Sequence, residues 1–179
     1  TTKLNANIST TGNQTYTGAM TVATNANLFG SGQNAVIALD GTVDGDTAAT
    51  KVLNISANNT GGRVVFGGAV GTVNLSDLNV TASAIALNGT SVATSGNQTY
   101  AGAITLGADT SLTGSNLITT SGSTVAGAGF SMNVTGNSFI GGDIANVNAL
   151  TVSGTTALNA NVSTTGSQTY TGAITLGAN

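Results

Sequence analysis

The stretch TTALNANVSTTGSQTYTGAITLGAN, residues 155–179, restates the opening of the chain, TTKLNANISTTGNQTYTGAMTVATN, residues 1–25. A third version, LNGTSVATSGNQTYAGAITLGAD, fills residues 87–109. The shared tyrosines are Tyr16, Tyr100 and Tyr170, so the second interval between copies is shorter than the first. Repetition on this scale is typical of stacked modules rather than of one closed globule. We therefore predict a segment of a longer repeat array, with a first module over residues 1–86, a second over 87–154 and the start of a third over 155–179.

The composition favours strands over helices. Charged residues make up 5% of the chain and aromatic residues 4%, and Pro, Cys, His and Trp are absent. Gly, Thr, Asn and Ser are poor in helix interiors and common in strands and turns. The hydrophobic fraction of 40% argues against a disordered chain. The only cations are Lys3, Lys51 and Arg63 and the net charge is -3, so we expect neither nucleic-acid binding nor membrane insertion in this segment.

Side chains alternate in the repeated stretch as they do in a strand with one buried face. In QTYTGAITLGA, the larger side chains of Tyr170, Ile174 and Leu176 fall on one face and the threonines on the other. We therefore expect Thr15, Thr17, Thr105 and Thr175 to be exposed or to lie in a second stacked face. The side chains expected to be buried are those of Ile8, Tyr16, Met20, Val22, Ile104, Leu106, Ile174 and Leu176.

Short strands about ten residues apart fit either a sandwich of two sheets or a solenoid of stacked coils. Near-identical segments favour the solenoid, with rows of the same residue type lying over one another and asparagines stacked at the turns. The predicted fold class is all-β, a parallel β-helix (β-solenoid). At roughly 20 residues per coil and about 4.8 Å between strands, we expect about nine coils and a rod of about 40 Å.

The motifs GNQTYTGAMTV, GNQTYAGAITLGADTSL and GSQTYTGAITLGAN, with VVFGGAVGTVNLSDLNV and SFIGGDIANVNALTV, resemble the repeats of filamentous haemagglutinin-like adhesins. These are two-partner-secreted or autotransporter surface proteins of bacteria. The resemblance implies a right-handed parallel β-helix that is exported and held outside the cell. It also implies a structural role in an adhesin or biofilm filament. The implied partners are neighbouring repeats, head to tail, and glycans or other cell-surface molecules.

Catalytic side chains are scarce. The chain has no His, Cys or Glu, and Asp77, Asp109 and Asp143 stand apart in the sequence, so we expect no enzyme and no catalytic residues. A polysaccharide-degrading β-helix is the weakest alternative. Glycan binding and ice binding are the others, although Thr-x-Thr recurs only at residues 15–17 and 169–171. The tyrosines are either core residues or platforms for sugars, and the Asn-x-Ser/Thr triplets are either stacked turn residues or sugar acceptors.

One acidic cluster stands out, formed by Asp40, Asp44 and Asp46. The path from Tyr16 to Phe66 is eleven positions longer than the corresponding path from Tyr100 to Phe139, so the first module carries an insertion. We expect this insertion, residues 33–50, to protrude as a loop. Three carboxylates so close in sequence suit Ca²⁺, but the spacing misses the EF-hand pattern. The alternatives are a weak Ca²⁺ site, the only cofactor considered, or a solvated Asp-Gly turn.

Overall fold

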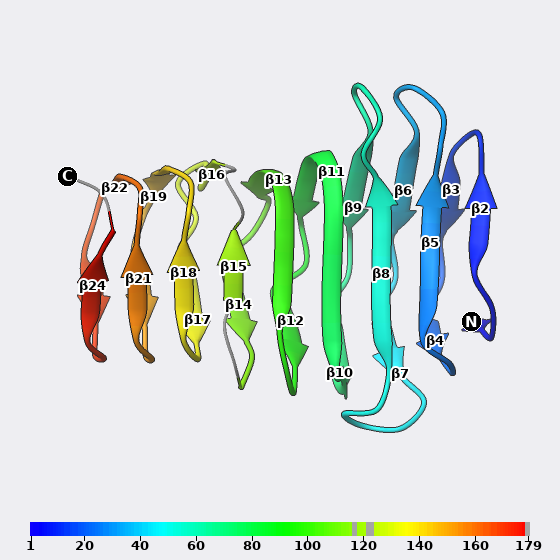
Figure 1. Ribbon diagram of the computed structural model, residues 1–179, viewed down its shortest axis with the longest axis horizontal. Helices are drawn as coiled ribbons and strands as arrows, with labels where there is room; N and C mark the ends of the chain where they lie inside the picture. Colours follow the sequence, from blue (N-terminus) through cyan, green and yellow to red (C-terminus); the bar gives the residue numbers. More distant parts are fainter. Residues whose placement is uncertain (116–117, 121–123, 178–179) are drawn as a thin grey trace.

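The computed structural model describes residues 1–115, 118–120 and 124–177, and the strands in this part of the chain form a β-solenoid with three rows of parallel strands. Figure 1 shows the rows running side by side along the long axis, with the two ends of the chain at opposite ends of the rod. Helices are absent from the described residues. The predicted all-β parallel solenoid is confirmed.

Each row is a stack of hydrogen-bonded strands. The first row contains β1 (Thr2–Leu4), β4 (Met20–Val22), β7 (Val43–Gly45), β10 (Val70–Leu75), β12 (Ser91–Thr94), β14 (Thr110–Thr113), β17 (Met132–Thr135), β20 (Leu150–Val152) and β23 (Gln168–Tyr170). The second contains β2 (Ile8–Thr10), β5 (Ala26–Gly30), β8 (Val52–Ala57), the first parts of β11 (Asp77–Leu87) and β13 (Gln98–Leu106), β15 (Ile118–Thr120), β18 (Ser138–Ile140), β21 (Thr156–Leu158) and β24 (Ile174–Leu176). The third contains β3 (Gln14–Tyr16), β6 (Val36–Leu39), β9 (Arg63–Phe66), the second parts of β11 and β13, β16 (Val125–Ala126), β19 (Ile144–Val147) and β22 (Val162–Thr164).

The first row is nine strands deep and therefore has eight intervals, so the chain makes about eight turns rather than nine. The turns differ in length. Asn137 and Thr155, at equivalent places on successive coils, are 18 residues apart, whereas Asn27 and Asn54 are 27 residues apart. Strand stacking fixes the axial rise at about 4.8 Å per turn whatever the corner length, so the rise over the described turns is about 38 Å. This length is close to that of the predicted rod.

The core runs through the middle of the rod. Ile104 and Leu106 are both buried on the same face of β13, and Thr105 between them is exposed, as the alternation predicts. Met20 and Val22 are also buried, while Ile8 and Tyr16 are half-buried. The prediction is wrong for Ile174 and Leu176, which are 44% and 71% exposed. Their strand, β24, is the last in its row, so no strand of the described residues covers it on that side.

The three sequence copies lie on different faces of the rod. Tyr16 lies in the third row, Tyr100 in the second and Tyr170 in the first. When β11 and β13 are each counted as two strand positions, each copy begins eleven positions after the one before. Eleven is not a multiple of three, so each module starts on a different face. The longer first module and the shorter second module thus share a strand count and differ in corner length.

Glycines stack at the corner between the third and first rows. A Cβ added to Gly41 would lie 2.5 Å from Gly18 C, and one added to Gly68 would lie 2.5 Å from Gly41 O. Such distances are shorter than any normal contact, so these positions accept only glycine without backbone movement. The Gly-Gly of the VVFGG motif is therefore explained by coils that approach closely at a corner.

The insertion does not protrude as a whole. β6 and β7 lie within residues 33–50, and Ile37, Leu39 and Val43 are buried in the core. The extra residues are divided among the corners after β5, β7 and β8, and Figure 1 shows the β7–β8 loop extending from the rod. An insertion spread over several corners leaves the strand stacking unchanged.

Candidate functional site

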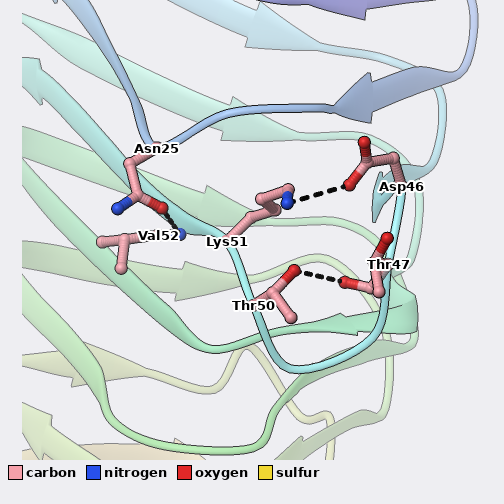
Figure 2. A network of polar contacts seen from close by, with 6 residues as sticks. All are labelled: Asn25, Asp46, Thr47, Thr50, Lys51 and Val52. Atoms are coloured by element: carbon pink, nitrogen blue, oxygen red, sulfur yellow. Dashed lines mark hydrogen bonds and ion pairs between the residues drawn. The ribbon is translucent and has the colours of Figure 1, made fainter.

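The three aspartates of the acidic cluster occupy different environments. Asp40 is exposed in the turn between β6 and β7. Asp44, in β7, accepts a hydrogen bond from Val73 N at 2.9 Å. Asp46 forms an ion pair with Lys51 Nζ at 3.3 Å, across the loop drawn in Figure 2. Within the described residues, no three acidic side chains form a group that could hold a metal ion.

Polar contacts hold the loop between β7 and β8, one within the loop and one to the preceding coil. Thr50 Oγ1 donates to Thr47 O at 3.0 Å, and Val52 N donates to Asn25 Oδ1 at 3.0 Å as the chain enters β8 (Figure 2). Together with the pair of Asp46 and Lys51, these contacts order the loop. Two of the three predicted metal ligands therefore have partners in the protein.

We expect Asp44→Ala to lower the free energy of unfolding by about 1 kcal/mol, because Val73 N–H loses its acceptor. Asp44→Asn retains an oxygen at that position and should be nearly as stable as the unchanged chain. Urea denaturation with and without Ca²⁺ provides the measurement. If Ca²⁺ stabilised the unchanged chain in proportion to the logarithm of its concentration, but not Asp44→Asn, the metal-site hypothesis would be supported instead.

Aspartates and asparagines at the corners or in the adjoining strands connect each coil to the next. The side-chain oxygen accepts a hydrogen bond from a backbone N–H one turn further along, at 2.7–3.1 Å. The acceptors are Asn7, Asn13, Asn25, Asp44, Asp77, Asp109, Asn137 and Asp143. Four of the six aspartates of the chain thus serve as structural acceptors. The sequence did not indicate this role, because the partner residues lie 18 to 29 residues away.

The sequence predicts asparagines stacked at the turns, and the structure instead places a ladder of asparagines on the strands of the second row. Asn54 Nδ2 donates to Asn27 Oδ1 at 2.7 Å, and Asn79 Nδ2 donates to Asn54 Oδ1 at 2.8 Å. Asn27 Nδ2 in turn donates to Asn7 at 3.1 Å. This ladder runs across four successive coils, parallel to the axis of the rod. It adds side-chain hydrogen bonds to the backbone pairing of β5, β8 and β11.

The QTY motif contains a polar pair that was not predicted from the sequence. Tyr100 Oη donates to Gln98 Oε1 at 2.9 Å, and Gln98 Nε2 donates to Val92 O at 3.0 Å and Thr113 O at 2.7 Å. Both side chains are fully buried. The same Tyr–Gln bond forms in the other copies, at 2.9 and 3.3 Å. The spacing in the sequence could have predicted this bond, because Gln and Tyr two residues apart in a strand lie on the same face.

Tyr100 is therefore a core residue rather than a sugar platform, and its burial has a consequence for pH. Burial raises the pKa of Tyr16, Tyr100 and Tyr170 above the ordinary value of 10.0. The unfolded chain loses these protons near pH 10, whereas folded Tyr100 keeps its proton. The stability that this tyrosine contributes is therefore fully present below pH 10 and decreases above it, by about 1.4 kcal/mol per pH unit for the fully buried Tyr100.

We expect alkaline denaturation, followed by circular dichroism, to coincide with the ionisation of Tyr100 in the ultraviolet spectrum. Tyr100→Phe lacks the ionisable hydroxyl. Its free energy of unfolding should therefore decrease less between neutral pH and alkaline pH than that of the unchanged chain. Ionisation of all three tyrosines near pH 10 with the fold retained would contradict the buried position of Tyr100.

The outer surface of the first row carries columns of small polar side chains. One column contains Ser91, Ser111, Asn133, Thr151 and Thr169, which are in register on five stacked strands. Thr113 and Thr135 form a second column beside it, which continues with the apolar Ala93. A surface groove of about 210 Å³ lies here, and its lining includes Ser111, Asn133 and Thr151. Hydroxyl and amide groups are thus more regularly spaced than the sparse Thr-x-Thr motifs suggest, because unrelated parts of the sequence contribute to one column.

Comparison with known proteins gives no relative: no family model, no curated protein and no solved structure matches this chain. In the described part of the chain, no helix is long and apolar enough to cross a membrane. The geometry of the rod itself therefore carries the functional argument.

Proposed function

We propose that the chain is a structural stalk segment of a large secreted bacterial surface adhesin or biofilm-matrix filament. The observation that carries this proposal is the continuity of the three strand rows through the described residues. A rod of parallel strands keeps its shape as coils are added, since each coil contacts only its neighbours. Extracellular location at the cell surface and head-to-tail contact with neighbouring repeats belong to the same proposal.

Two further features support a mechanical rather than a catalytic role. Corner Asp and Asn side chains bind the backbone of the following coil, so acidic groups are used to hold the rod together. The modules keep eleven strand positions although the second is shorter than the first. The number of strands in a module sets its length along the axis, whereas the corner lengths do not. A constant strand number with corners of different length is therefore expected if each module serves to extend the rod. No catalytic residue is assigned in this proposal.

A deletion in phase with the repeat tests the stalk role. Removing residues 17–100 joins Tyr16 to Ala101 and takes out eleven strand positions, so the rod should fold and shorten by about 18 Å. In a bacterium that displays the whole surface protein, binding to the target surface should be kept at equal display level, with a shorter reach in electron micrographs. Loss of binding at equal display would place receptor contact in the deleted module and contradict a passive stalk.

The polar columns of the first row favour a second candidate, binding of a glycan or of ice. The groove over Ser111, Asn133 and Thr151 is the specific observation. Replacing Thr113, Thr135, Thr151 and Thr169 by Val should leave the fold intact, because these side chains are half-buried or exposed. Loss of binding to a glycan array, or of thermal hysteresis, in this variant would support the second candidate. The stalk proposal predicts that neither activity is present in the unchanged chain.

A further inference from the structure

The C-terminal face of the rod, formed by β22, β23 and β24, exposes side chains that belong to a core. Ile174 and Leu176 are 44% and 71% exposed. The residues that occupy their place in the earlier copies, Met20 with Val22 and Ile104 with Leu106, are at most 3% exposed. The three copies share their sequence pattern and the order of strands within the module, so the difference in exposure comes from what covers the strands.

The same face occurs twice more in the chain, and both times three strands cover it. In the first copy β2, β3 and β4 are covered by β5, β6 and β7. In the second copy β12 is covered by β14, and the two parts of β13 are covered by β15 and β16. All these pairings are parallel. The covering strands are always the three that follow directly in the sequence.

The glutamine of the QTY motif also points to a covering strand. Gln14 Nε2 donates to Phe29 O in β5 at 2.9 Å, and Gln98 Nε2 donates to Thr113 O in β14 at 2.7 Å. Each acceptor lies fifteen residues after its glutamine. Gln168 donates to Val162 O at 3.2 Å, within its own coil. The acceptor equivalent to Phe29 and Thr113 would lie at position 183, four positions beyond Asn179.

We propose that the face formed by β22, β23 and β24 binds three strands with the pattern of β5, β6 and β7, supplied by a further repeat that continues in the same polypeptide. This inference rests on the proposed stalk function and identifies the partner of one end of the stalk. In a second, separate copy the strands β5, β6 and β7 already cover that copy's own β2, β3 and β4, so they are not free to bind. The residues that connect β4 to β5, Ala23, Thr24 and Asn25, have their sequence counterparts at 177–179.

An extended chain provides the test. A copy of residues 26–66 is joined directly after Asn179, which keeps the repeat in phase. Hydrogen exchange of the Ile174–Leu176 amides should slow by at least about tenfold and approach that of Met20–Val22. The side chain of Tyr170 should become buried, so its pKa should rise further and its ionisation should shift toward that of Tyr100.

Matched controls separate specific docking from the mere presence of extra chain. Leu28→Asp with Ile37→Asp in the appended copy places charges at positions that are fully buried in the first module, and should abolish the protection. Phe29→Asp with Ala38→Asp, at adjacent outward positions, should leave it in place. The proposal would be overturned if the unaltered extension and both altered extensions protected the amides equally. It would also be overturned if the unaltered extension gave no protection.

A second source of partner is tested in the same samples. Protection of Ile174–Leu176 in the unextended chain at high concentration, with a dimer in light scattering, would assign the face to a separate copy and overturn covalent continuation. The result is independent of the deletion experiment on whole cells. If the appended strands gave no protection, the docking proposal would be wrong but the stalk role would not be affected. If the deletion abolished surface binding, the stalk role would be wrong but docking at this face would not be affected.

Discussion

Ile104→Asp should unfold the chain, or lower its free energy of unfolding by at least about 4 kcal/mol, because it places an unpaired carboxylate in the core. Ile104 is 3% exposed and lies between Ile85 and Val125 in the third row. It also lines a cavity of about 20 Å³ whose lining is almost entirely apolar. A water molecule there would find few polar partners, so it would not compensate the buried charge.

The matched control is Thr105→Asp, one residue further along the same strand with its side chain exposed. This substitution adds the same charge on the outside of the rod and should change the unfolding free energy by less than about 1 kcal/mol. Thermal and urea denaturation of both variants measure the difference. Similar stability of the two variants would refute the inward position of Ile104 and with it the register of β13.

Gln98→Ala should cost about 3 kcal/mol of unfolding free energy, the second largest expected effect. The substitution removes the acceptor of Tyr100 Oη and the donor to Val92 O and Thr113 O. These groups are in the core, where an unsatisfied polar atom costs about 1–3 kcal/mol. Gln98 also joins two successive coils through Thr113, so its loss should weaken the rod locally, with faster hydrogen exchange in β14 than in β4.

Gln168→Ala provides the control, since it alters the same motif where the glutamine is exposed and water can replace it. Its cost should be below about 1 kcal/mol. Tyr100→Phe should fall between the two, because only one hydrogen bond is removed. A cost for Gln168→Ala equal to that of Gln98→Ala would mean that burial does not set the strength of the motif.

The strands and their buried faces could be predicted from the sequence because both are local properties. A period of two in the side chains is sufficient to place Ile104 and Leu106 inward and Thr105 outward. The stacking could not be predicted in the same way. Which strands lie over one another depends on the sum of many corner lengths, and the distance between equivalent places on successive coils varies from 18 to 27 residues.

The candidate site shows the same division between local and distant effects. The cluster of Asp40, Asp44 and Asp46 was visible in the sequence, but the partner of Asp44 is Val73, in the next coil. Gln98 is buried although glutamine is usually exposed, so its residue type alone does not predict its place in the core. The exposure of Leu176 depends on the lack of a covering strand among the described residues of its row, which no property of the residue itself reveals.

The strand count of the module also determines which way each copy faces. With eleven positions per module and three faces per turn, a continued array would return to its first face only after three modules. Three modules make eleven turns, which corresponds to about 53 Å along the axis. A loop carried once per module would then wind around the rod as a slow spiral. A filament of this kind would display the loop on all three faces. A target approaching from any direction would meet the same loop within one period of the spiral.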